Sequence, residues 1–155
     1  MRDIRLFMKM LDRFNKKILS ILLQEGRLPI SHLAARVGIS KSPCQARVKK
    51  LEEEGYILGY KALLNHSKMG QDLVAYAQVT MSDTRDPALK EFDAAVHKIA
   101  EVEECYMIAG AFDYLLKIRT SDINSYRAVL GQHISSLPYV ASSSTFVSMQ
   151  AIKER

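Results

Sequence analysis

Residues 29–53 of this chain read PISHLAARVGISKSPCQARVKKLEE, and their spacing predicts two short helices joined by a tight turn. Pro29 suits the first turn of a helix, and the apolar residues that follow at helical spacing form its inner face: Ile30, Leu33, Ala34 and Val37. Gly38 ends this helix, and Ser40 caps another one. Only residues 38–40 separate the two helices. A turn of that length containing a glycine predicts a helix-turn-helix.

A further helix precedes this pair. Asp12 can cap it, Gly26 can stop it, and its apolar residues recur at helical spacing: Phe14, Ile18, Ile21 and Leu22. After the pair, which ends at Gly55, the run YILGY at residues 56–60 is rich in β-forming residues and predicts a short strand or wing. We therefore predict a winged helix-turn-helix domain over residues 1–61.

The second helix of the pair has two distinct faces. At about 100° per residue, Cys44, Val48 and Leu51 lie on one side, and we predict that they face the small core. The other side presents small polar and charged residues: Ser42, Gln45, Ala46, Lys49 and Glu53. A small polar face with an early serine and glutamine suits insertion into the major groove of double-stranded DNA. The alternatives are a plain basic surface or a protein-interaction module.

We accordingly predict DNA contacts from eight residues of this helix: Lys41, Ser42, Pro43, Gln45, Ala46, Arg47, Lys49 and Lys50. Gln45 suits the edge of an adenine, and Ser42 suits a base or a phosphate. The three lysines would neutralise phosphates. Arg47 lies near the seam with the core, where it has two alternatives, a phosphate or a nearby carboxylate.

The charge distribution agrees with a polyanionic partner for the first part. Residues 1–61 contain 13 Lys and Arg against 6 Asp and Glu, a net charge of +7, whereas residues 62–155 contain 9 against 11, a net charge of −2. The basic excess therefore belongs wholly to the predicted helical domain, which favours nucleic acid as its partner.

The second part of the chain alternates strands and helices. Four strands are predicted over residues 73–81, 102–108, 113–119 and 140–149. A helix begins at residues 84–87 between the first two strands, and Ser121 or Asp122 caps another, which Pro138 ends. The order β-α-β-β-α-β predicts a ferredoxin-like domain over residues 73–155, joined to the first domain by a connection over residues 62–72. The whole chain is thus predicted to be an α+β protein.

The helices of such a unit cover only one face of its sheet. Along the first strand, Val74, Tyr76, Gln78 and Thr80 alternate with Leu73, Ala75, Ala77 and Val79, so neither face is strongly polar. We therefore expect a symmetric homodimer through the sheets, which would also present two DNA-binding helices to a pseudo-palindromic site. Glu103 and Glu104 are predicted to be solvated surface.

Several function classes find no support in the residues. The two cysteines, Cys44 and Cys105, lie far apart and form no metal-type pair, and the four histidines lack a common ligand spacing, so we expect no metal and a reduced, cytoplasmic setting. Residues 1–10 lack a continuous apolar segment and the chain has no apolar run of about 18 residues, so we expect neither a signal peptide nor a membrane-spanning helix. The absence of a nucleophile elbow, a P-loop and a GxGxxG motif favours a protein that is not an enzyme and has no catalytic residues and no cofactor.

The chain resembles the leucine-responsive/AsnC (feast-famine) family of regulators from about Met10 to Met149. In the first part the resemblance rests on Leu11-Asp12-Arg13, Gly26-Arg27, Leu33-Ala34, Arg36-Val37-Gly38, Ser40, Ser42-Pro43-Cys44, Arg47-Val48, Leu51-Glu52, Gly55-Tyr56-Ile57 and Gly59-Tyr60. In the second part it rests on Glu104-Cys105, Gly110, Phe112-Asp113-Tyr114, Tyr126, Leu137-Pro138, Val140 and Thr145.

This resemblance implies a winged helix-turn-helix followed by a ferredoxin-like domain, which pairs chains and often assembles into octamers or other even oligomers. It also implies that a free amino acid binds in clefts between neighbouring dimers. It points to an effector site at the turn before the third strand and on the last strand: Tyr106, Ile108, Gly110, Ala111, Asp113, Ser143 and Thr145. The runs at residues 107–110 and 140–147 are similar to members that control amino-acid catabolism, proline use among them.

One departure from the family concerns the turn. Many relatives have Gly-Asp-Phe-Asp where this chain has Gly110-Ala111-Phe112-Asp113, so one carboxylate is absent and a leucine-type response is in doubt. Asp113 then has two alternatives, as the partner of a ligand ammonium group or as an acceptor for nearby backbone N–H groups. For the whole protein, we expect an amino-acid-responsive transcription regulator of amino-acid metabolism, the alternative being an architectural oligomer that wraps DNA with little specificity.

Overall fold

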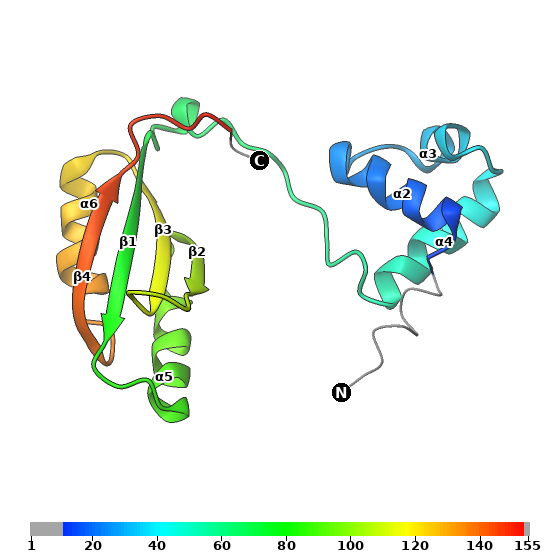
Figure 1. Ribbon diagram of the computed structural model, residues 1–155. Helices are drawn as coiled ribbons and strands as arrows, with labels where there is room; N and C mark the ends of the chain where they lie inside the picture. The colour runs from blue at the N-terminus through cyan, green and yellow to red at the C-terminus, as the bar shows by residue number, and fades with distance from the viewer. Residues whose placement is uncertain (1–10, 154–155) are drawn as a thin grey trace. The chain divides into compact units, whose positions relative to one another are not determined.

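The computed structural model describes residues 11–153, and these form two compact units (Figure 1). The first unit ends at Leu63 and the second begins at Leu64. Each unit has its own cluster of buried apolar side chains.

Within residues 11–63, the described part of the first unit, there are three helices: α2 (Arg13–Gln24), α3 (Ile30–Val37) and α4 (Lys41–Glu53). The Asp12 side chain caps α2, since its Oδ1 accepts a hydrogen bond of 2.8 Å from the Asn15 N–H. Pro29 takes the N-cap position of α3 and not its first turn. Ser40 is at the N-cap of α4, although its side chain makes no capping hydrogen bond. The fully or nearly fully buried residues are those predicted from helical spacing, with at least two from each helix: Ile18, Ile21, Leu33, Ala34, Val37, Cys44 and Leu51.

The tight turn between α3 and α4 depends on Gly38. Its φ of +89° lies in the left-handed region, which residues with a Cβ rarely adopt. In this conformation the N–H groups of Gly38 and Ile39 both donate to the Ala34 carbonyl oxygen, at 2.9 and 3.1 Å. The backbone groups at the end of α3 thereby form hydrogen bonds, and only three residues separate α3 from α4. This confirms the predicted helix-turn-helix.

Of the two alternatives for residues 56–60, a strand or a wing, the strand is wrong, since none of these residues lies in a strand. A strand needs a partner to hydrogen-bond its backbone, and the described part of the chain pairs no strand with this segment. Tyr56 and Ile57 instead pack against the helical core, and Tyr60 bonds to α4. The β-forming residues of this segment therefore pack against the helices and do not form a strand.

The second unit is a four-stranded antiparallel sheet with its helices on one face (Figure 1). Its elements are η1 (Ser67–Met69), β1 (Leu73–Met81), α5 (Asp86–Val96), β2 (Val102–Met107), β3 (Tyr114–Thr120), α6 (Ile123–Val129), η2 (Leu130–Ile134) and β4 (Val140–Val147). The strand order β2-β3-β1-β4 with this chain order confirms the predicted ferredoxin-like βαββαβ unit. Asp122, and not Ser121, caps α6.

Alternation along the strands separates a helix-covered face from an open face. Ala75, Ala77 and Val79 of β1 are completely buried under the helices. Phe92 of α5 packs there against Tyr114 of β3, with ring centroids 4.3 Å apart. The open face carries the residues between them, and its exposed aromatic side chains are Tyr76, Tyr106 and Phe146.

Candidate functional site

Helix α4 presents to solvent the surface that the sequence predicted for it. Cys44 and Leu51 are buried and Val48 is half-buried, whereas seven other residues from Lys41 to Lys50 are exposed: Lys41, Ser42, Pro43, Gln45, Ala46, Lys49 and Lys50. Burial also raises the pKa of the Cys44 thiol, which keeps it neutral as a core residue. Helix α4 therefore has a continuous polar face that a DNA groove could accept.

Arg47 is engaged within the helical unit. One of its guanidinium nitrogens, Nη1, lies 2.7 Å from Asp12 Oδ2 and 2.8 Å from Asn15 Oδ1. The guanidinium also lies 5.4 Å from the centre of the Phe14 ring. The Asn15 backbone N–H and then Arg47 lower the pKa of Asp12, so the carboxylate is charged at neutral pH. Of the two alternatives for Arg47, the structure shows the carboxylate, which links α4 to the start of α2.

Lys49 and Lys50 each face a glutamate one turn further along the helix. The Lys49–Glu53 and Lys50–Glu54 pairs both have N···O distances of 3.5 Å. Exposed pairs of this kind contribute only about 0.3–0.5 kcal/mol. A DNA phosphate can therefore displace either glutamate at little cost.

The predicted effector residues at the turn between β2 and β3 lie close together. The Ile108 N–H donates to the Asp113 carbonyl oxygen at 2.7 Å, and Gly110 and Ala111 are exposed between them. The Asp113 N–H donates to the Val79 carbonyl oxygen at 2.9 Å. Asp113 Oδ2 in turn accepts a hydrogen bond of 2.7 Å from the Met81 N–H. The half-buried carboxylate thus bonds the turn to the end of β1. Of the two alternatives for Asp113, the structure shows the acceptor of a backbone N–H.

The predicted effector residues on β4, Ser143 and Thr145, lie on the helix-covered face of the sheet. Thr145 is paired with Ala77, and its Oγ1 is 2.6 Å from the hydroxyl of Tyr126 on α6, which places it on the helix-covered face. Ser143, two residues away and paired with Val79, shares that face. Tyr106 faces the open side, where its hydroxyl donates to Glu104 at 2.7 Å. Within one chain, therefore, Tyr106 does not share a pocket with Ser143 and Thr145.

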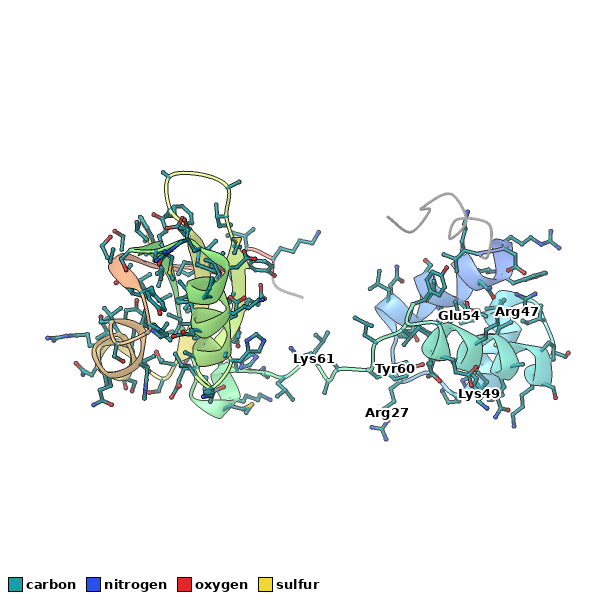
Figure 2. All side chains as sticks on the ribbon, turned by 90° about the horizontal axis from the view of Figure 1, so that it is seen from below. Arg27, Arg47, Lys49, Glu54, Tyr60 and Lys61 are labelled. Carbon is teal, nitrogen blue, oxygen red and sulfur yellow. The ribbon has the colours of Figure 1, made fainter. Side chains whose placement is uncertain are left out.

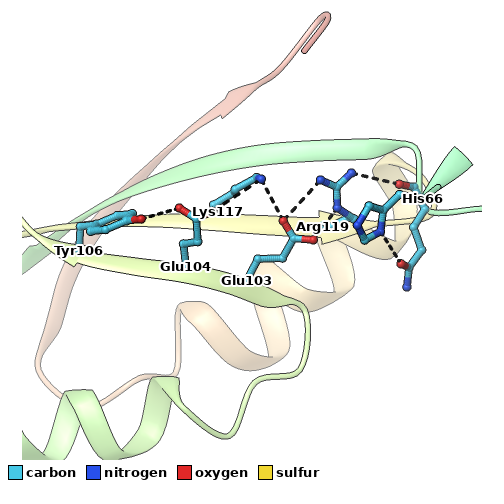
Figure 3. Close-up of polar contacts among 7 residues, drawn as sticks. His66, Glu103, Glu104, Tyr106, Lys117 and Arg119 are labelled. Carbon is cyan, nitrogen blue, oxygen red and sulfur yellow. Dashed lines mark hydrogen bonds and ion pairs between the residues drawn. The ribbon is translucent and has the colours of Figure 1, made fainter. Parts of the chain in front are cut away.

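The open face also carries an ionic network that the sequence did not predict (Figure 3). Lys117 Nζ lies 3.1 Å from Glu103 and 3.8 Å from Glu104, and Arg119 Nε lies 2.5 Å from Glu103. Partial burial acts to raise the pKa of Glu103, but Arg119 and Lys117 outweigh it and the pKa is lowered. Glu103 and Glu104 are exposed, as predicted for solvated surface, but the ion pairs that they form with Lys117 and Arg119 were not predicted. The available signal was the alternation of Lys117 and Arg119 with the buried Leu116 and Ile118.

Two cavities lie at the end of this face next to the segment after β4. One, of about 280 Å³, is lined by residues that include His66, Gln71 and Arg119, and the other, of about 540 Å³, by residues that include Tyr76 and Lys117. Neither includes a residue of the predicted effector set. Among residues 11–153, no cluster of His, Cys, Asp or Glu could hold a metal ion, and no helix is long and apolar enough to span a membrane.

The fold and its exposed helix define a class: a helix-turn-helix protein with an appended ferredoxin-like domain. Comparison with known families agrees over both units. Residues 11–57 match the family model described as winged helix-turn-helix DNA-binding, and residues 74–155 match the Lrp/AsnC ligand binding domain.

Individual relatives span nearly the whole chain. A proline dehydrogenase transcriptional activator from Rhizobium radiobacter is 61% identical, over 93% of this chain and 92% of the relative. A second one, from Rhodobacter capsulatus, is 47% identical over 94% and 95%. A solved structure of a transcriptional regulator from Neisseria meningitidis in complex with L-methionine has a TM-score of 0.88 and 33% identity, covering 94% of each chain. The chain belongs to the Lrp/AsnC family, and it is a DNA-binding transcriptional regulator and not an enzyme.

Proposed function

We propose that this regulator controls a gene of amino-acid catabolism, proline oxidation being the first candidate, and that a free amino acid alters its action on DNA. The observation that carries the proposal is the 61% identity, over 93% of the chain, with a proline dehydrogenase transcriptional activator. The L-methionine bound to the similar Neisseria regulator supports an amino acid as the effector class.

In this proposal the first half of α4 enters the major groove. Its exposed residues from Lys41 to Ala46 include a cation, a hydroxyl and an amide, and Lys49 and Lys50 extend the positive charge. The backbone N–H groups of the first helical turn add donors that favour a phosphate. Arg47 would support this surface by holding α4 to Asp12, and it would reach a phosphate only by leaving that pair.

We further propose that the regulator acts as an even-numbered homo-oligomer, with the open faces of the sheets as one interface. The exposed aromatic residues of that face support this, since Tyr106 and Phe146 are 53% and 54% exposed in the single chain. The effector residues on the two sides of the sheet would then meet only between chains. Sedimentation of the full chain tests the assembly, and a monomer at micromolar concentration would rule it out.

A mobility-shift experiment tests the function. The full chain is titrated onto the promoter of the proline dehydrogenase gene of the same genome and onto unrelated DNA, at two salt concentrations, with and without proline. Tight, salt-sensitive binding that favours the promoter and changes with proline is expected. Equal binding to both DNAs with a footprint of many helical turns would instead indicate an architectural wrapper. Failure to bind either DNA would refute the proposal.

Gln45→Ala is expected to relax preference at one base pair of the site, because a bidentate contact to adenine contributes about 1–3 kcal/mol of discrimination. Selection from a library of randomised sites measures it. Lys49→Ala is the comparison: loss of a phosphate contact weakens all sequences alike and lowers the salt slope by about one unit. An unchanged base preference in the Gln45 variant would remove that residue from base recognition.

Asp113→Asn separates the two roles of Asp113. The amide oxygen can still accept the hydrogen bond from the Met81 N–H, but the negative charge that would pair with a ligand ammonium group is gone. We expect the variant to fold and to lose the effector response. Thermal shift with a panel of amino acids measures this, since a ligand at about 100 times its Kd stabilises the native state by about 2.7 kcal/mol. A variant that still responds fully to the amino acid would show that Asp113 has only a structural role.

A further inference from the structure

The two halves of α4 differ in charge. Residues 41–47 include Lys41 and Arg47 and no acidic residue, a net charge of +2, whereas residues 48–54 contain two lysines and three glutamates, a net charge of −1. A duplex that accepts the first half in its groove has its backbone close to the second half as well. The second half has a net negative charge and its two lysines are paired with glutamates, so positive charge from another segment would strengthen the contact with the backbone at that end.

Tyr60 brings the chain after α4 back to this end of the helix. Its hydroxyl donates a 2.8 Å hydrogen bond to Glu52 Oε1. Its ring lies against the turn between α2 and α3, where a Cβ added to Gly26 would be 3.6 Å from the ring carbon Cδ1. Burial, and then the Glu52 carboxylate, raise the pKa of Tyr60 to about 12, so the hydroxyl keeps its proton at neutral pH. Residue 60 is therefore fastened to the helical unit at two points.

Each of the two contacting residues is followed directly by a basic one. Arg27 follows Gly26 and Lys61 follows Tyr60, and consecutive Cα atoms are only about 3.8 Å apart. Both basic side chains are exposed, and neither forms an ion pair with a residue in the range 11–153. Figure 2 shows the Arg27 side chain pointing away from the helices at the end of the unit where Tyr60 lies.

We propose that Arg27 and Lys61 form a second phosphate-contacting edge, next to the acidic end of α4, and that Tyr60 is the positioning residue that holds Lys61 in place. Unlike Lys49 and Lys50, which must first leave Glu53 and Glu54, these two cations are available at once. The edge would contact the DNA backbone without reading bases, and would thus add affinity without changing sequence preference. This inference rests on the proposed binding of DNA.

The test measures the affinity of the full chain for one promoter fragment over a range of KCl concentrations by fluorescence anisotropy. Arg27→Ala and Lys61→Ala are each expected to lower the slope of log K against log [KCl] by about one unit, and the double variant by about two. Lys90→Ala, which removes an exposed lysine from α5 of the other unit, is the matched control and should leave the slope unchanged. Base preference should stay as in the unchanged protein.

Tyr60→Phe examines the positioning role, because it keeps the ring and removes only the hydroxyl bonded to Glu52. We expect a smaller salt slope than that of the unchanged protein, and no further fall when Lys61→Ala is added. Additive effects of the two changes would overturn the role of Tyr60. Melting curves of every variant check that the helical unit is folded. A smaller salt slope then reports a lost phosphate contact and not unfolding.

The failure of this inference is distinguishable from failure of the proposed function. If the unchanged protein binds DNA with a clear salt dependence but the Arg27/Lys61 double variant has the same slope, the second edge is wrong and the DNA-binding function stands. A double variant that changes the mass of the oligomer but not the slope would also overturn the edge, and would assign the two cations to a contact between chains.

Discussion

Leu51→Ala is expected to abolish DNA binding by unfolding the helical unit. Leu51 is 1% exposed and lies among buried residues of all three helices. Truncation of a fully buried leucine to alanine lowers the free energy of unfolding by about 2–5 kcal/mol, because apolar contacts are lost and a cavity remains. A unit of this size has a total stability of only a few kcal/mol, at about 0.05–0.15 kcal/mol per residue. The variant should therefore be largely unfolded in this unit.

Leu23→Ala is the matched control, since Leu23 is a leucine of the same unit that is 82% exposed. Its change in unfolding free energy should stay within about 0.5 kcal/mol. Circular dichroism melts and DNA affinity are compared for the two variants. If Leu51→Ala melts and binds as Leu23→Ala does, the assignment of α4 to a shared three-helix core is wrong.

Phe92→Ala should have an effect at least as large on the second unit. The Phe92 side chain is completely buried against Tyr114 and the central strands, and truncation of such a phenylalanine costs about 3–5 kcal/mol. We expect the sheet unit to unfold and the effector response to disappear. Because the two units have separate cores, the helical unit should keep its own melting transition.

Phe92→Leu supplies the graded comparison. Leucine fills much of the same volume, so the loss of stability should be clearly smaller than for alanine. Calorimetry of the full chain resolves which transition moves. A shift of the helical unit's transition together with that of the sheet unit would contradict the separation into two cores.

Much of this structure could be predicted from local patterns. Each helix of the first unit carries apolar residues at helical spacing, and the buried ones include Ile18, Leu33 and Leu51. The two-residue alternation over residues 73–81 likewise predicted the strand β1. Such periodicities depend only on how each element winds, so they can be interpreted before any contact is known. For the same reason the exposed face of α4, which carries most of the candidate DNA surface, followed from its sequence.

The points that the sequence left open or predicted wrongly have a common physical cause, since each depends on a partner distant in sequence. The YILGY run has β-forming composition, but composition does not supply a neighbouring strand, and Tyr60 bonds to Glu52 instead. Thr145 and Tyr106 both belong to strands, yet only the register that pairs Thr145 with Ala77 shows that they lie on opposite faces. The ionic network likewise requires β2 and β3 to be adjacent.

Local patterns were enough to predict the helix-turn-helix, the βαββαβ order and the inward faces of the three helices of the first unit, because backbone periodicity and capping act over a few residues. Tertiary structure alone decided that Arg47 pairs with Asp12, that Asp113 bonds the Met81 N–H, and that Lys117 and Arg119 share Glu103. A charged or polar side chain can satisfy its hydrogen bonds with many partners, and its choice is made by what packing and strand register bring within about 3 Å.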